Sequence, residues 1–142
     1  MPQRPRHHAD VRRFAFELPA RTESVARARR LAEERLALWG CDGEIRDTVL
    51  LIVSELVTNA VVHTASGRVV CELREGEERL RIAVRDEGGP AGPRMRDCGE
   101  EERGRGLILV DALSSAWGAD RTGHGTAQVV WAELAHGMAE PC

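Results

Sequence analysis

The stretch "TVLLIVSELVTNAVVHT", Thr48 to Thr64, joins an apolar helical segment to two polar side chains near its middle. Apolar residues fill positions 49–53, whereas Glu55 and Asn59 follow four residues apart among leucine, valine and alanine. On a helix, positions i and i+4 lie on one face, about 6 Å apart along the axis. The stretch therefore predicts a largely buried helix that carries a carboxylate and a carboxamide on one stripe.

Two explanations of this stripe are open. It could face solvent, as one side of many helices does. Alternatively, the two side chains serve a bound partner, because a buried carboxylate without compensation is costly. The amide oxygen of Asn59 suits Mg²⁺, which takes few protein ligands, and Glu55 one turn earlier can orient or deprotonate a nucleophile. The pattern favours the second explanation.

Before this helix, the chain predicts a strand and a first helix. Arg13 to Leu18 alternates polar and apolar residues, and Thr22 to Trp39 has helical spacing with Gly40 as a stop. The quoted stretch belongs to a second helix from about Glu44 to His63, with Asp42 as its N-cap.

After this helix, a hairpin, a third helix and a last strand are expected. They comprise the strands Arg68 to Arg74 and Arg79 to Asp86 with Gly76 in the turn, a helix from Leu107 to about Ala116 stopped by Gly118, and a strand from Thr126 to Leu134. The order predicts an α+β fold, a two-layer α/β sandwich whose mostly antiparallel mixed sheet is covered on one face by about three helices.

The composition is that of one ordinary globular domain. The 142 residues carry a net charge of −3, so no basic surface for nucleic acid is expected. All basic residues are arginine, the four cysteines lack metal-site spacing, and no apolar run reaches membrane-spanning length. We expect a cytoplasmic protein without a membrane segment, with a flexible tail over residues 1–12, a domain over 13–134 and a C-terminal tail over 135–142.

Two glycine-rich segments are candidate ligand sites. Asp86 in "RDEGGP" closes a strand, where its carboxylate can accept a hydrogen bond from the amino group of a base; an ordinary turn is the simpler alternative. In "RGRGLILV", Gly104 and Gly106 allow close backbone approach, and Arg105 and the start of a helix favour an anion. A flexible lead into the helix is the alternative there.

Four motifs in this order resemble one family: "SELVTNAVVHT", "VRDEGG", "GRGLILVDAL" and "GTAQVVWAEL". Together they are similar to the ATP-binding domain of histidine-kinase-like ATPases, the Bergerat fold shared with gyrase and mismatch-repair ATPases. Within that superfamily the chain looks most like stand-alone serine kinases that act as anti-sigma factors. The resemblance covers Phe14 to Leu134, almost the whole chain.

The resemblance implies a role for each matching residue. Asn59 would coordinate Mg²⁺, and Glu55 would be the base that acts on the acceptor hydroxyl. The adenine site would consist of Asp86 for the amino group, Gly88 to give room for the base and Thr126 behind it. Residues 88–105, approximately, would form an ATP lid. Under it, the phosphates would be bordered by four residues that lead into the third helix: Gly104, Arg105, Gly106 and Leu107.

The chain departs from the family pattern in three places. Pro90 stands where many relatives have the second glycine of the D-x-G-x-G motif, and the lid carries an acidic run, Glu100 to Glu102. Relatives often use a lysine near the γ-phosphate, which this chain lacks, so either Arg105 serves there or that contact is absent. His63 matches the family pattern, with a structural role as the alternative.

The resemblance implies an ATP- and Mg²⁺-dependent protein-serine kinase. Such an enzyme phosphorylates an anti-anti-sigma antagonist and holds a sigma factor when the antagonist is phosphorylated. A homodimer is also implied. The alternative is a non-catalytic module of the same fold, in which ATP only sets the conformation of the lid.

Overall fold

A computed structural model describes residues 12–64, 67–86, 107–122 and 127–135. In these ranges the chain forms three helices and a five-stranded sheet. Along the chain the elements are β1 (Arg12–Pro19), α2 (Glu23–Leu38), α3 (Gly43–His63), β2 (Arg68–Glu75), β3 (Arg79–Asp86), a short helix over residues 107–113, β4 (Ala116–Thr122) and β5 (Ala127–Ala135). The expected α+β sandwich is confirmed.

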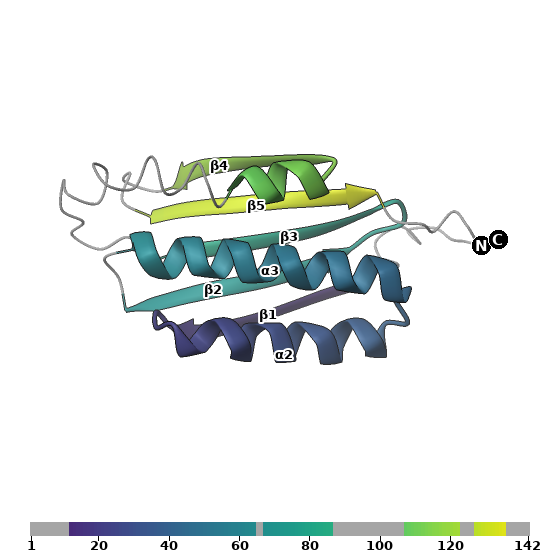
Figure 1. The fold of residues 1–142 in the computed structure, drawn as a ribbon, viewed down its shortest axis with the longest axis horizontal. Coiled ribbons are helices and arrows are strands. Elements are labelled where there is room, and N and C mark those ends of the chain that lie inside the picture. Colours follow the sequence, from purple (N-terminus) through teal and green to yellow (C-terminus); the bar gives the residue numbers. More distant parts are fainter. Residues whose placement is uncertain (1–11, 65–66, 87–106, 123–126, 136–142) are drawn as a thin grey trace, which may run out of the picture.

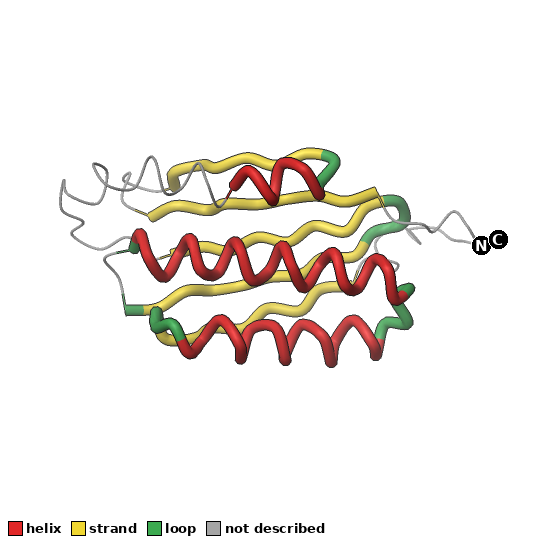
Figure 2. The backbone as a smooth tube through the Cα atoms, viewed as in Figure 1, coloured by secondary structure: helices red, strands yellow, loops and turns green. Residues whose placement is uncertain are grey.

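The sheet forms one layer and the helices form the other (Figure 1). Its strand order is β1-β2-β3-β5-β4, and each of the four pairings is antiparallel. The helices all lie on the same side of the strands, as Figure 2 shows. The predicted β2–β3 hairpin is present, and the backbone N–H of Gly76 donates to the carbonyl of Arg79 at 2.9 Å. One face of the sheet is therefore covered, and the other carries no helix from the described ranges.

The core lies between these two layers. Alternate residues of the central strands point toward the helices and are buried, such as Leu73 on β2 and Ile82 on β3. From the other side, α3 contributes fully buried residues such as Ile52 and Leu56. Because α3 contacts both α2 and the sheet, its sequence is apolar around most of its circumference.

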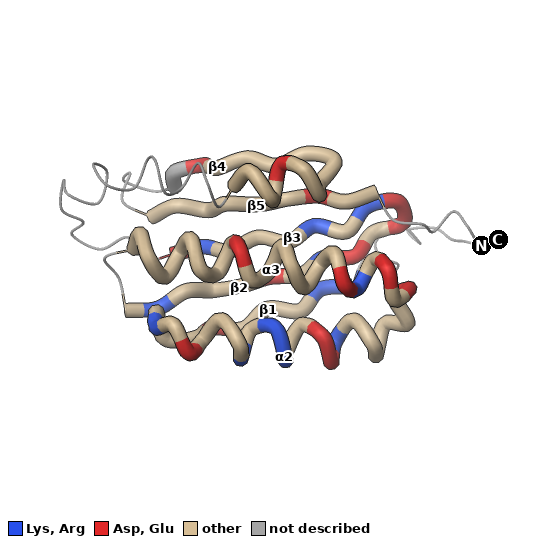
Figure 3. The backbone as a smooth tube through the Cα atoms, in the orientation of Figure 1, with Lys and Arg blue, Asp and Glu red and all other residues tan. Residues whose placement is uncertain are grey.

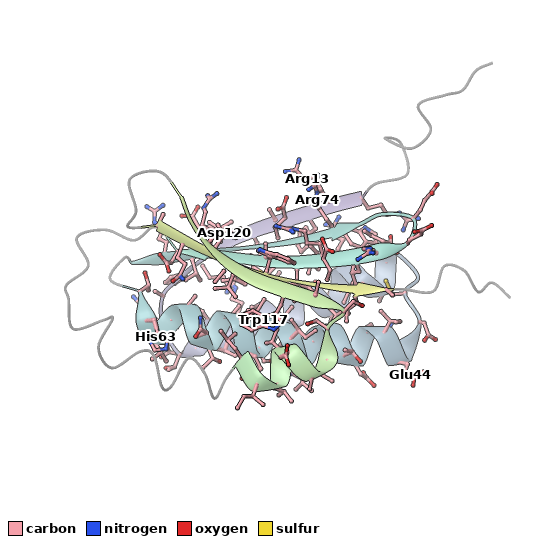
Figure 4. The ribbon with its side chains drawn as sticks, turned by 90° about the horizontal axis from the view of Figure 1, so that it is seen from above. Arg13, Glu44, His63, Arg74, Trp117 and Asp120 are labelled. Carbon is pink, nitrogen blue, oxygen red and sulfur yellow. The ribbon has the colours of Figure 1, made fainter. Side chains whose placement is uncertain are left out.

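The helix-free face of the sheet carries charged side chains instead. Ion pairs link neighbouring strands there: Arg13–Glu72, Arg68–Glu17, Arg79–Glu133 and Arg81–Glu133. Figure 4 shows Arg13 and Arg74 directed away from the helices. Charges also follow the strands and the outer sides of the helices in Figure 3. Exposed pairs of this kind contribute little stability, so the buried layer carries the fold.

The junction between α2 and α3 follows the predicted pattern with one difference. Gly40 has a φ of 76°, a left-handed conformation that glycine adopts without strain, and α2 ends just before it. Asp42 occupies the N-cap position of α3, as expected, but its side chain makes no capping hydrogen bond. At the helix start, the backbone carbonyl of Asp42, not its carboxylate, accepts a hydrogen bond from the N–H of Arg46 at 2.8 Å.

The sequence-based prediction for residues 107–118 was wrong in its second half. The third helix ends at residue 113, and Ala116–Thr122 form β4, a strand that the sequence pattern did not reveal. Gly118 is not a helix stop, since it pairs with Trp131 inside the sheet. A Cβ atom at this position would lie 2.8 Å from the indole ring, so the glycine is required by close contact with that ring.

Within the described ranges, no helix has both the length and the apolar character needed to cross a membrane. The predicted ATP lid over about 88–105 and both predicted tails, except for Arg12 and Ala135, lie outside the described residues.

Candidate functional site

Three polar residues follow one another at four-residue intervals along α3, and the last two are buried. Glu55 is half-buried, Asn59 is only 8% exposed, and His63 at the end of the helix is also 8% exposed. Each step of four residues turns the side chain by about 40° around the axis. The line therefore begins at the solvent edge and ends inside the sandwich, where Figure 4 shows His63 at the opposite end of α3 from Glu44.

This line runs along the flank of α3 that faces away from α2. The α2 side is marked by Ser54, which accepts a hydrogen bond from the guanidinium of Arg29 at 2.8 Å. Asn59, five residues further on, lies about 140° around the helix from Ser54. Thr48 is on nearly the same line as Asn59, and it borders a cavity of about 340 Å³ together with Leu113, Ser115 and neighbouring residues. The flank of Asn59 thus faces β5 and the helix over residues 107–113.

Asp86 lies at the same end of the sandwich. It is the last residue of β3, and the alternation of that strand directs it inward with Val84 and Ile82. The residue is 8% exposed. Because α3 packs on β3 and both elements end at the same edge in Figure 1, Asp86 and the Asn59–His63 part of α3 border one region.

The amide of Asn59 has no partner among the described residues. None of the hydrogen bonds in this part of the chain uses its side chain, although the residue is almost fully buried. A buried amide without a hydrogen bond costs free energy, so its retention fits a group that is bound from outside. Its oxygen is of the type that Mg²⁺ accepts, and no cluster of three or more metal-binding His, Cys, Asp or Glu occurs in the described ranges. The amide oxygen of Asn59 therefore fits the donor chemistry of a Mg²⁺ ligand.

The two described cysteines offer no alternative chemistry. Burial raises the pKa of the Cys71 thiol to about 12, with a further contribution from Glu72. Burial and then the nearby Glu75 raise the pKa of Cys41 to about 11. Both side chains are therefore neutral thiols near pH 7, which makes them poor nucleophiles and poor metal ligands.

The structure describes four of the predicted site residues. Glu55 and Asn59 lie one turn apart on one flank of α3, and Asp86 ends β3 at the same edge of the fold. Leu107 begins the helix over residues 107–113 and is buried, at 6% exposure. The other predicted site residues lie outside the described ranges, namely Gly88, Gly104, Arg105, Gly106 and Thr126. The departures from the family pattern at Pro90 and at Glu100 to Glu102 lie outside them too.

One polar residue near Asp86 was not singled out from the sequence. Gln128 is the cross-strand partner of Asp86 on β5. The signal that could have identified Gln128 is its polar side chain at an inward position of an otherwise apolar strand. Its position beside Asp86 depends on the register of two strands that are far apart in the sequence.

Comparison with known proteins agrees with this arrangement. The family model described as the histidine kinase-like ATPase domain matches residues 18–131. A search of curated proteins gave no match. The matched range contains both long helices, the β2–β3 hairpin and all four described site residues. By this match the chain belongs to the family of histidine kinase-like ATPase domains, and ATP binding follows from that membership.

Proposed function

We propose that the protein is an ATP- and Mg²⁺-dependent protein-serine kinase that acts as an anti-sigma factor. The observation that carries the proposal is the pair Glu55 and Asn59. Asn59 is a buried amide with no partner in the described part of the chain, and Glu55 is a half-buried carboxylate one turn away on the same flank. Nucleotide binding alone does not require the second group, whereas phosphoryl transfer to a hydroxyl uses a base.

In this proposal each described residue has a separate task. Asp86 accepts the amino group of adenine, and Asn59 contributes an oxygen ligand to Mg²⁺. When bound, the metal ion neutralises phosphate charge. Glu55 orients the hydroxyl of the acceptor serine and takes its proton as the oxygen attacks the γ-phosphorus. The bond from that phosphorus to the β–γ bridging oxygen breaks, and ADP leaves.

The partners follow the family resemblance. The phosphate acceptor would be a small anti-anti-sigma antagonist, and the kinase would hold a sigma factor once that antagonist is phosphorylated. Transcription would thereby depend on the phosphorylation state of the antagonist. We further propose that the kinase works as a homodimer in the cytoplasm, without direct contact with nucleic acid.

The proposal is tested in two steps. Tagged protein is first used to capture partners from the native cell with and without MgATP, and mass spectrometry identifies them; a sigma factor and a small antagonist are expected. The captured antagonist is then incubated with γ-labelled ATP and wild-type protein, Glu55→Gln or Glu44→Gln. Loss of a general base typically slows transfer by about 10²- to 10⁴-fold, so Glu55→Gln should transfer almost no label at equal ATP occupancy.

Glu44→Gln is the matched control. Glu44 lies on the same helix and on nearly the same flank, but 11 residues before Glu55, or about 16 Å along the axis. It should transfer label at the wild-type rate. Equal transfer by all three proteins would remove Glu55 from catalysis. Absence of transfer to every captured partner, with ATP binding intact, would instead support the non-catalytic module.

A further inference from the structure

The inward face of β5 carries one polar residue beside the buried carboxylate of β3. Gln128 and Asp86 are direct cross-strand partners in an antiparallel pair. Side chains of such a pair lie on the same face, with Cβ atoms about 4.5–5.5 Å apart. The same register places Val69 of β2 on the other side of Asp86. Asp86 therefore stands between an apolar neighbour and a carboxamide.

Gln128 is unusual for its strand. The next inward positions of β5 are Val130, Ala132 and Leu134, all of them buried in the core. Gln128 is half-buried, and no hydrogen bond within the described ranges uses its carboxamide. An apolar side chain would serve the core at lower cost in this position, because it carries no polar group that needs a partner. The amide is thus available to a ligand that reaches Asp86.

The chemistry of adenine matches this pair of side chains. Its base-pairing edge presents an amino group, which donates hydrogen bonds, next to the ring nitrogen N1, which accepts one. A carboxylate is an acceptor only, and a glutamine amide has two N–H donors. Guanine presents the reverse order, with an acceptor O6 beside a donor N1–H. A carboxylate and an amide side by side can therefore distinguish the two purines.

We propose that Gln128 is a base-specificity residue, whose amide N–H donates to N1 of adenine while Asp86 accepts the amino group. The proposal rests on the proposed ATP site and adds a second contact to the base. Gln128 and Asp86 together would then hydrogen-bond to N1 and to the adjacent amino group of adenine. ATP would be selected over GTP by both side chains rather than by the carboxylate alone.

The test compares nucleotides that differ by one atom or group. Calorimetry measures the binding of ATP and of 1-deazaadenosine 5′-triphosphate, which keeps the amino group but lacks N1. Wild-type protein should prefer ATP by roughly 2- to 10-fold, as expected for one hydrogen bond. In Gln128→Leu and Gln128→Met, which cannot donate, the preference should fall to about 1. Val129→Ala, on the opposite face of the same strand, should keep the wild-type preference.

A second nucleotide separates the two contacts. Purine riboside 5′-triphosphate keeps N1 but lacks the amino group, so its disadvantage against ATP should persist in both Gln128 variants. If the Gln128 variants keep the wild-type preference for ATP over the 1-deaza analogue, the proposed contact is overturned while the ATP site stands. If folded wild-type protein binds none of the three nucleotides, the proposed function fails, and the role of Gln128 fails with it.

Discussion

The two parts of α3, residues 43–54 and residues 55–63, here called its first and second halves, differ in how their polar side chains are bonded. In the first half, Thr48 donates to the carbonyl of Glu44 at 3.1 Å, and Ser54 donates to the carbonyl of Leu50 at 3.0 Å while accepting from Arg29. In the second half, the side chains of Glu55 and Asn59 make no hydrogen bond among the described residues. The first half uses its polar groups for the fold. In the second half, we propose that the side chains of Glu55 and Asn59 serve a ligand.

This difference has a free-energy consequence. A buried amide without a partner typically costs about 1–3 kcal/mol relative to a satisfied one. Asn59 is the more buried of the two groups and carries most of this cost. The protein without nucleotide should therefore be less stable than its apolar packing allows, and a bound ligand should recover the difference.

The largest expected effect is on the free energy of unfolding, and it comes from the apolar packing that both halves of α3 share. Leu56 is fully buried in the second half, and Leu56→Ala should lower the free energy of unfolding by about 2–5 kcal/mol. Urea unfolding measures this, with Leu51→Ala as the control, since Leu51 is 39% exposed. Equal losses of unfolding free energy in the two variants would mean that the second half is loosely packed. The unbonded side chains of the second half would then reflect disorder instead of a ligand site.

The next effect concerns the carboxylate that faces the second half of α3. Asp86→Asn replaces an acceptor with an amide that can present a donor to the amino group of adenine. ATP binding should weaken by about 1–3 kcal/mol, while the fold persists. Calorimetry with ATP tests this, and an unchanged affinity would remove Asp86 from the adenine site.

Asn59→Leu should change stability and binding in opposite directions. It replaces the unpaired amide with an apolar side chain of similar size, so the nucleotide-free protein should gain about 1 kcal/mol in unfolding free energy. The same variant should lose the Mg²⁺ dependence of ATP binding, and EDTA should bring wild type to a similar affinity. A stability loss together with retained Mg²⁺ dependence would show that the amide serves the fold.

The smallest effect is expected in the first half. Ser54→Ala removes the hydrogen bond with Arg29 on α2, which is partly exposed, and should cost about 0.5 kcal/mol without altering ATP affinity. Thermal unfolding and calorimetry together check this. A marked fall in ATP affinity would show that the two halves of α3 are coupled rather than separate.

Local periodicity predicted most of the fold. The long helices, β1 and the β2–β3 hairpin were identified because each has a strong apolar repeat and a turn residue at its end. β4 was missed because "AWGADRT" has small residues where a strand usually has branched ones, and its Gly118 looks like a helix stop. Its place in the sheet depends on contact with Trp131, which no local pattern contains.

The site divides in the same way. Glu55 and Asn59 were proposed because two polar residues interrupt an apolar helix, and Asp86 because it ends a strand beside glycines. Gln128 could not be proposed from these signals, since its place beside Asp86 comes from the register between β3 and β5. Two residues that are distant in the sequence can be recognised as neighbours only from the strand pairing in the structure.

The pairing of β1 with β2 has a consequence for the order of folding. β2 and β3 are joined by a short turn at Gly76, whereas Pro19 and Arg68 meet only after the chain has passed through both α2 and α3. Closing the longer loop costs more conformational entropy and slows the formation of its contacts. We therefore expect the central hairpin to form before the edge strand β1 is added. Pulsed hydrogen exchange during refolding should protect the amides of β3 first and those of β1 last.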